Sequence, residues 1–180
     1  MSEIELLAPA KNIECAMAAI THGADAVYIG GPSFGARAAA GNSFEDLEQL
    51  VRFAHPYHAK VMVTLNTILT DRELEEAEQQ VKRYYSMGID ALIVQDMGLL
   101  KLDLPPIALH ASTQMDNRTP EKVKFLQNAG FQRVVLAHEL SLQQIRQIRE
   151  QCEVELEAFV HGALCVSYSG RCYMSYAACG

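Results

Sequence analysis

Seven short apolar runs, separated by amphipathic segments, organise the chain. Runs of four or five small and branched apolar residues are typical of strands that are buried on both faces, as in parallel sheets. They predict strands at Ile4–Ala8, Ala26–Gly30, Val61–Leu65, Ala91–Val94, Ile107–His110, Val134–Ala137 and Leu156–Val160. Between most of these runs, apolar residues recur every three or four positions, which is the period of a helix with one buried face. The pattern therefore predicts alternating strands and helices.

Polar residues mark where several of the helices begin. Thr70 with Glu73, and Ser141 with Gln144, have the spacing of a capping box, in which each side chain accepts a hydrogen bond from a backbone N–H of the first turn. We therefore expect helices to start just after Thr70 and Ser141.

Three glycines mark where helices end. Gly23, Gly88 and Gly130 each lie three or four residues before a predicted strand. Glycine readily adopts the left-handed conformation that closes many helices. The recurrence indicates an internal repeat of a helix, a glycine turn and a strand.

The fold class that this repeat favours is α/β, with about seven parallel strands. The first strand runs into Ala8-Pro9-Ala10-Lys11, which is not the glycine-rich turn of a doubly wound dinucleotide-binding sheet. Polar residues instead follow nearly every strand, so we predict a TIM-type (β/α) barrel. A complete barrel takes about 250 residues. The 180 residues thus predict a single partial barrel domain over 1–180, the N-terminal part of a longer protein.

Composition narrows the classes of function. Hydrophobic residues make up 49% of the chain and charged residues 21%, as in folded globular proteins. No apolar run approaches the roughly 20 residues that cross a bilayer, and the acidic start does not resemble a signal peptide, so we expect a cytoplasmic protein with no membrane partner. The net charge of −7 argues against a broad basic face for nucleic acid but leaves room for a local basic pocket.

In a barrel, the residues that follow the strands meet on one face, where such enzymes react. The predicted catalytic candidates on this face are His110, Gln114, Glu157 and His161. The predicted substrate-binding candidates are Arg37, Gln95, Asp96 and Ser112.

Simpler roles compete with several of these assignments. His110 continues an apolar strand and could be a core residue. Arg37 could clamp a carboxylate or phosphate, or lie on the surface. Asp96 could bind a polar ligand, or cap a short turn at Met97–Leu102.

The five cysteines fall into two groups. Cys15 and Cys152 lie in helical patterns and are expected to be small buried residues. Cys165, Cys172 and Cys179 lie within fifteen residues, which in a reducing compartment favours metal or redox chemistry.

Three kinds of chemistry fit the cysteine-rich stretch. An iron–sulfur cluster needs four thiolates as a rule, and the stretch supplies at most three. Zinc could take cysteines together with His161, although the usual C-x-x-C spacing is absent. A cysteine nucleophile activated by His161 is the third.

The same stretch resembles the signature of a known family. Its ordered pattern is Glu157-x-Phe159-x-x-Gly162-Ala163-Leu164-Cys165-x4-Gly170-x-Cys172-x-Met174-Ser175. Further blocks include Phe34-Gly35-Ala36-Arg37-Ala38 and His110-Ala111-Ser112-Thr113-Gln114. Together they resemble the collagenase-like peptidase family, peptidase family U32, over essentially the whole chain. His138 departs from the pattern, since many members have arginine there, and histidine would hold an anion less strongly near neutral pH.

The resemblance implies more than the peptidase activity of the family name. Relatives hydroxylate tRNA or rRNA, with prephenate implicated as donor, and others act in oxygen-independent ubiquinone hydroxylation. Their recurring cofactor is an iron–sulfur cluster, [4Fe–4S], with ligands that match Cys165 and Cys172; the remaining two would follow Gly180, and Cys179 is not at a signature position.

Three hypotheses follow from the resemblance. The leading one is an RNA hydroxylation enzyme acting on RNA with a small carboxylate substrate. The alternative is a peptidase that uses the same face on a peptide, with Cys165 or His161. The third is a non-catalytic binding portion.

Overall fold

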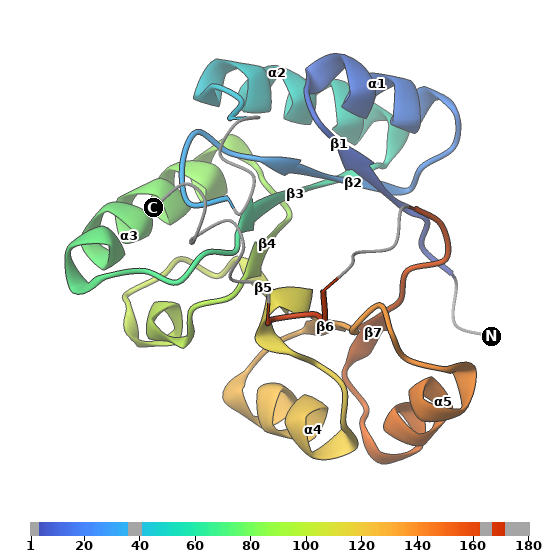
Figure 1. Ribbon diagram of the computed structural model, residues 1–180. Helices are drawn as coiled ribbons and strands as arrows, with labels where there is room; N and C mark the ends of the chain where they lie inside the picture. Colours follow the sequence, from blue (N-terminus) through green and yellow to red (C-terminus); the bar gives the residue numbers. More distant parts are fainter. Residues whose placement is uncertain (1–3, 36–40, 163–166, 172–180) are drawn as a thin grey trace. The chain divides into compact units, whose positions relative to one another are not determined.

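The computed structural model describes residues 4–35, 41–162 and 167–171 (Figure 1). The chain divides into two compact units, Met1–Ala108 and Leu109–Gly180. Each unit is a run of parallel strands alternating with helices, as the apolar pattern predicts.

The first unit contains four parallel strands in chain order. They are β1 (Leu7–Ala10), β2 (Ala26–Gly30), β3 (Lys60–Leu65) and β4 (Ala91–Val94). Val27 pairs with Val61, and Val63 with Leu92; all four are fully buried. Burial on both faces explains why β2, β3 and β4 read as continuous apolar runs rather than alternating ones.

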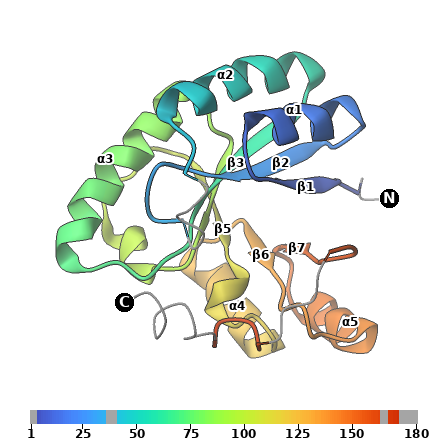
Figure 2. The ribbon, with the colours of Figure 1, turned by 45° about the horizontal axis from the view of Figure 1, so that its top comes forward.

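Helices of the first unit cover this sheet. They are α1 (Ile13–Thr21), α2 (Phe44–Ala54) and α3 (Asp71–Met87), with 3₁₀ turns η2 (His55–Tyr57) and η3 (Met97–Lys101). α1 packs on β1 and β2, and α2 packs on β3 and lies beside both α1 and α3 (Figure 2). The buried stripe of α2 is Leu47, Leu50, Val51 and Ala54, the spacing expected for a helix with one apolar face.

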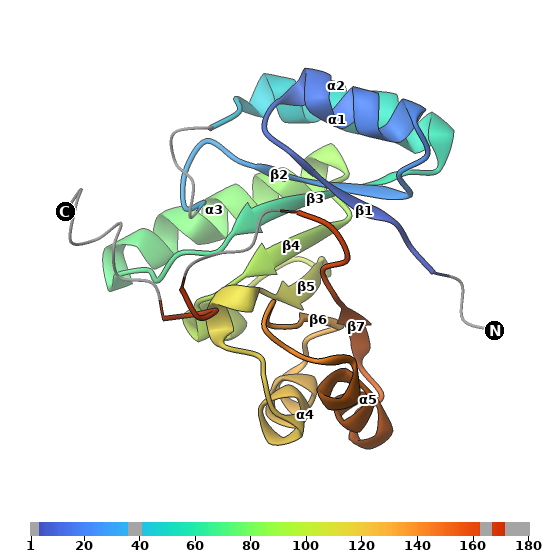
Figure 3. The ribbon, with the colours of Figure 1, turned by 45° about the vertical axis from the view of Figure 1, so that its right-hand side comes forward.

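The second unit begins within β5 (Ala108–Ala111) and contains β6 (Arg133–Val135) and β7 (Glu155–Glu157). The three strands are parallel and in chain order. Its helices are η4 (Thr113–Met115), α4 (Pro120–Ala129) and α5 (Leu142–Gln151). α4 and α5 lie side by side, as Figure 3 shows.

One hydrogen-bonded turn recurs before every second strand, at β2, β4 and β6. In each case, a side-chain oxygen two residues after the turn glycine accepts from a backbone N–H at the start of the preceding strand, over 2.7 Å. The backbone N–H of the residue that carries this oxygen donates in return to the backbone carbonyl of the same partner residue. The pairs are Asp25 with Leu6, Asp90 with Val61, and Gln132 with Leu109. The internal repeat predicted from the glycines is therefore a physical repeat.

The predicted helix boundaries are confirmed. Both capping boxes form, and Gly88 and Gly130 close their helices with φ of +88° and +106°. The last strand is shorter than predicted, because it ends at Glu157 and leaves Phe159 and Val160 exposed beyond the sheet.

The prediction that both isolated cysteines are buried is right for Cys152 and wrong for Cys15, which is exposed. α1 turns Ala16 and Ile20 into the core. Successive residues of a helix are about 100° apart, so Cys15 falls beside the buried stripe rather than on it.

Within the described ranges, no helix is long and apolar enough to cross a membrane.

Candidate functional site

Two of the predicted substrate-binding residues follow β4 in the first unit. Both carboxylate oxygens of Asp96 accept backbone hydrogen bonds, from Gly98 at 2.7 Å and from Leu69 at 2.8 Å. Asp96 thus caps η3, the simpler role that the sequence offered, and a role in substrate binding stays a prediction. Gln95 is half-buried beside it. Arg37 lies outside the described residues.

In the second unit, three candidates lie on or just after β5. His110 is buried in the strand, and Ser112 is buried at its end, where its hydroxyl accepts from the N–H of Gln114 at 3.2 Å. Gln114 is half-buried in the turn that follows. These neighbours in sequence shape one loop, which continues to Arg118.

Arg133 forms an ionic cluster with Glu155 and Glu157, and strand register places His110 opposite Arg133. His110 pairs with Arg133, and Arg133 with Glu155, so these residues lie in line across three strands. The guanidinium group of Arg133 donates to Glu155 at 3.0 and 2.8 Å and lies 3.7 Å from the carboxylate of Glu157. Glu157 is therefore positioned by a buried arginine that sequence reasoning did not single out.

The remaining candidates lie beyond β7. His161 is exposed after the strand. Cys165 and Cys172 lie outside the described residues, so their metal-binding role stays a prediction. In residues 4–35, 41–162 and 167–171, no group of three or more His, Cys, Asp or Glu side chains is arranged to hold a metal ion.

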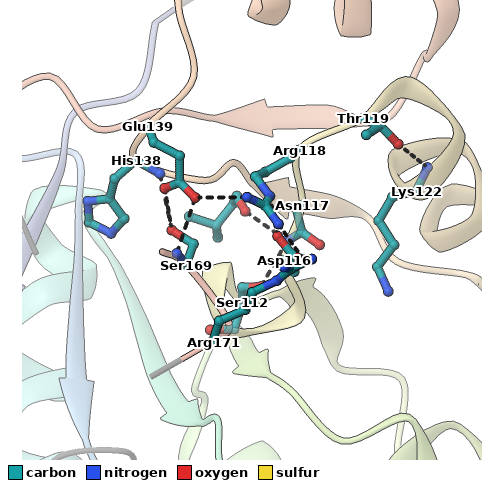
Figure 4. Close-up of polar contacts among 11 residues, drawn as sticks. Ser112, Asp116, Asn117, Arg118, Thr119, Lys122, His138, Glu139, Ser169 and Arg171 are labelled. Atoms are coloured by element: carbon teal, nitrogen blue, oxygen red, sulfur yellow. Dashed lines mark hydrogen bonds and ion pairs between the residues drawn. The ribbon is translucent and has the colours of Figure 1, made fainter. Parts of the chain in front are cut away.

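A polar network occupies the loops after β5 and β6 (Figure 4). Arg118 forms an ion pair with Asp116, including a 2.8 Å hydrogen bond, and lies 3.7 Å from Glu139. The buried amide of Asn117 donates to the backbone oxygens of Ser112 and Val135, both at 2.8 Å. Asn117 therefore joins the loop after β5 to the end of β6 through hydrogen bonds.

Residues 167–171, called here the signature segment, lie against these two loops. The Ser169 hydroxyl donates to Glu139 at 2.9 Å and accepts from the N–H of His138 at 3.3 Å. The Ser169 N–H donates to the second oxygen of Glu139 at 3.2 Å, and Arg171 pairs with Asp116 at 3.4 Å. This segment lies between Cys165 and Cys172 in the chain.

The charges around Asp116 favour its ionised form. Burial acts to raise the pKa of this carboxyl, but hydrogen bonds and charges from Arg118 and Arg171 outweigh burial, so its pKa is lower than the ordinary value. Asp116 is therefore an anion at neutral pH that holds two arginines.

Aromatic rings border the network. The ring of His138 stacks on Phe159 with centroids 3.8 Å apart and planes 15° from parallel. The Arg118 guanidinium lies 5.4 Å from the exposed ring of Tyr168. His138, which departs from the family pattern, thus contributes its ring to a stack and its N–H to the signature segment.

Sequence reasoning did not single out Asp116 and Arg118 as site residues. One signal was present: both come within four residues of the end of the His110–Gln114 block, in a loop at a strand end. Arg133 also had a signal, since it is the charged residue that opens an otherwise apolar strand.

Comparison with known families and proteins identifies what the chain is similar to. The model of peptidase family U32 matches residues 11–180. The chain is 60% identical over 177 residues to the 23S rRNA 5-hydroxycytidine C2501 synthase of Escherichia coli, and 38% identical over 175 residues to tRNA hydroxylation protein P1 of Bacillus subtilis. It is 31% identical over 189 residues to the collagenase of Porphyromonas gingivalis.

These matches cover nearly all of this chain but less than half of each relative. The alignments take in 98%, 95% and 97% of the chain, and 27%, 42% and 45% of the respective relatives.

Among solved structures, a U32 peptidase superposes with a TM-score of 0.74 at 16% identity, covering 88% of this chain and 69% of that one. The thiamine phosphate pyrophosphorylase of Pyrococcus furiosus superposes with a TM-score of 0.61 at 15% identity, covering 86% and 73%. The prediction of a partial (β/α) barrel fold is confirmed by the first of these likenesses.

Proposed function

Because the chain belongs to peptidase family U32, we propose that it is the barrel portion of an enzyme that hydroxylates a pyrimidine base in ribosomal or transfer RNA. The single observation that carries the proposal is its 60% identity, over 98% of the chain, to an rRNA 5-hydroxycytidine synthase. Its identity to the collagenase is half as high, at 31%.

The position of the signature segment supports the same proposal. The segment lies against the loops that follow β5 and β6, through Ser169 and Arg171. Those loops come at the carboxyl ends of parallel strands, where barrel enzymes carry out their chemistry. A cofactor held beside this segment would therefore lie at the reactive end of the barrel.

The proposed cofactor is an iron–sulfur cluster, with Cys165 and Cys172 as two of its ligands. The described residues fit such a group in one respect: residues 167–171, five of the six between the two cysteines, are held to the neighbouring loops through Ser169 and Arg171. Thiolates are the usual ligands of these clusters. When bound, the cluster would supply electron transfer at the site.

The proposed co-substrate is prephenate, a small dicarboxylate, and the residue proposed to bind it is Arg37. A guanidinium group binds carboxylates through two parallel hydrogen bonds, which lysine cannot reproduce. Arg37→Lys should therefore raise the prephenate concentration needed for half-maximal hydroxylation. A matched control is Arg52→Lys, which changes an exposed arginine of α2.

The test of the function is nucleoside analysis of RNA from a strain that lacks the gene. Loss of a hydroxylated pyrimidine, restored by the wild-type gene but not by Cys165→Ser, is the expected result. Cys15→Ser is the control, because it removes an exposed thiol of α1 and should restore the nucleoside fully. Unchanged hydroxylated nucleosides in the deletion strain would contradict the proposal.

A peptidase is the second candidate, favoured by the collagenase among the relatives. It would use the same strand-end face, with Cys165 or His161 in the chemistry. Purified protein would then cleave gelatin, and Cys165→Ser or His161→Ala would abolish cleavage. Cleavage that survives both changes would come from another site or another protein.

A further inference from the structure

We propose that Asp116, Arg118 and Glu139, called here the loop clamp, are positioning residues that fix the signature segment before any cofactor binds. The inference rests on the proposed function only for the identity of the cofactor. The clamp itself is defined by contacts within the second unit.

The first anchor of the segment is Ser169. Both oxygens of the Glu139 carboxylate accept from this one residue, from its hydroxyl at 2.9 Å and its N–H at 3.2 Å. The hydroxyl also accepts from the N–H of His138 at 3.3 Å. Three hydrogen bonds on one serine fix its backbone as well as its side chain.

The second anchor is Arg171, two residues further along. It pairs with Asp116 at 3.4 Å, Asp116 pairs with Arg118, and Arg118 lies 3.7 Å from Glu139. The interactions therefore form a ring that leaves the segment at Ser169 and returns to it at Arg171 (Figure 4). Two anchors so close together restrict the backbone between them.

Gly170 lies between the anchors, and its backbone touches the loop after β5. Its φ is +74°, and a Cβ placed there would lie 2.7 Å from the carbonyl oxygen of Gln114 and 2.9 Å from the amide nitrogen of Asp116. Those are backbone atoms of a loop that Asn117 fastens to two neighbouring backbone carbonyls. The segment fits only because residue 170 has no side chain.

The consequence concerns the two cysteines that flank the segment. Cys172 follows Arg171 directly, and Cys165 comes two residues before Ser167. Fixing the segment during folding removes conformational freedom that cofactor binding would otherwise have to remove. The clamp should therefore be formed in the cofactor-free protein and should slow loss of the cofactor once it is bound.

The experiment compares two glycine substitutions in the full-length protein. Gly130 also has a positive φ, +106°, but a Cβ there meets nothing within 4 Å. Gly130→Ala therefore introduces backbone strain alone, and Gly170→Ala introduces strain together with a clash. Hydrogen exchange of the 167–171 amides is measured in cofactor-free protein, and iron release to a chelator is measured after reconstitution.

Gly170→Ala should speed exchange in 167–171 by at least about tenfold, which corresponds to losing one or two hydrogen bonds. Gly170→Ala should also speed iron release and should leave exchange in β5–β7 unchanged. Gly130→Ala should change neither exchange in 167–171 nor iron release. Equal exchange in the two variants would overturn the proposal. Wild-type protein that takes up no iron would instead contradict the proposed cofactor, and the exchange comparison would still test the clamp.

A second pair of variants avoids the steric clash. Ser169→Ala removes the hydroxyl that bonds Glu139 and His138, and Ser86→Ala removes an exposed hydroxyl that donates to one backbone carbonyl on α3. Faster exchange in 167–171 for Ser169→Ala, absent in Ser86→Ala, supports the clamp even if Gly170→Ala fails to fold. Unchanged exchange in Ser169→Ala would overturn it.

Discussion

The starts and the ends of the strands use polar side chains in opposite ways. At the starts, Asp25, Asp90 and Gln132 make the same bond to a backbone N–H at the same distance, before β2, β4 and β6. At the ends, each loop differs: Asp96 caps a 3₁₀ turn in the first unit, and Glu139 holds Ser169 in the second.

This difference indicates that the bonds at the strand starts stabilise the sheet, whereas the bonds at the strand ends shape individual sites. A bond that recurs before every second strand satisfies a backbone donor at the start of its neighbour, so its effect is on stability. A bond found in one loop only, such as that of Glu139 to Ser169, positions residues that belong to that loop's own site. In barrel folds generally, the starts of strands contribute to stability and the ends carry chemistry, and the two kinds of hydrogen bond follow that division.

Arg133 is the strongest test of this distinction between strand starts and strand ends. It is the first residue of β6, yet its side chain reaches Glu157 at the end of β7. Its side chain is 11% exposed and pairs with Glu155 and with Glu157, whose side chain is 16% exposed. Arg133→Met removes the buried guanidinium that faces the partly buried Glu157 carboxylate, so we expect a loss of about 2–3 kcal/mol in the free energy of unfolding. Urea denaturation measures it.

Arg146→Met is the matched control for that change, because Arg146 is exposed on α5. It should cost less than about 0.5 kcal/mol. If both variants unfold at the same urea concentration, the ionic cluster contributes nothing to stability.

Asp90→Ala should have the next largest effect. It leaves the N–H of fully buried Val61 without its 2.7 Å side-chain acceptor and removes a 3.2 Å contact to His55. An unsatisfied buried donor costs about 1–3 kcal/mol, so we expect a loss near the middle of that range by urea denaturation. Asp103→Ala, at an exposed aspartate of the same unit, should be nearly neutral; an equal loss there would remove any special role for the recurring turn.

Gln132→Ala asks whether the same device operates in the second unit. The N–H of Leu109 loses a neutral acceptor here, and hydrogen bonds to neutral groups are weaker than those to carboxylates. We expect a loss of about 1 kcal/mol, with exposed Gln143→Ala as the control. A larger loss than for Asp90→Ala would show that the charge of the acceptor does not determine how much each turn contributes to the free energy of unfolding.

Whether an interaction can be predicted from the sequence depends on how far apart its two residues lie along the chain. The capping boxes, the glycine stops and the Asp96 turn all join residues two to four positions apart, so local spacing predicts them. The loop clamp joins residues 30 and 55 positions apart, Glu139 to Ser169 and Asp116 to Arg171. No local pattern marks such pairs, because strand order brings them together.

The same limit applies to the ionic cluster. Glu157 stands in the family signature, but its partner Arg133 is identified only when parallel register pairs Val135 with Glu157 and Arg133 with Glu155. Sequence reasoning therefore found the carboxylate and missed the arginine. A candidate list taken from strand ends omits residues at strand starts whose side chains reach across the sheet.

The smallest expected effect belongs to the strand ends and depends on pH. The pKa of Asp116 is lower in the folded protein, because Arg118 and Arg171 outweigh the effect of burial. Its contribution is therefore fully present above the unfolded-state pKa of about 3.9 and is lost as the pH falls through the lower folded-state value. Asp116 is 29% exposed, so we expect less than about 1 kcal/mol.

Asp116→Asn provides the measurement, because asparagine keeps the shape of the side chain and removes the charge. The difference in unfolding free energy between wild type and Asp116→Asn should be constant from pH 5 to pH 7. It should shrink below about pH 4 as the wild-type carboxyl takes up a proton. A difference that stays constant to pH 3 would mean that Asp116 acts through shape alone, and that the strand ends, like the starts, contribute hydrogen bonds rather than charge.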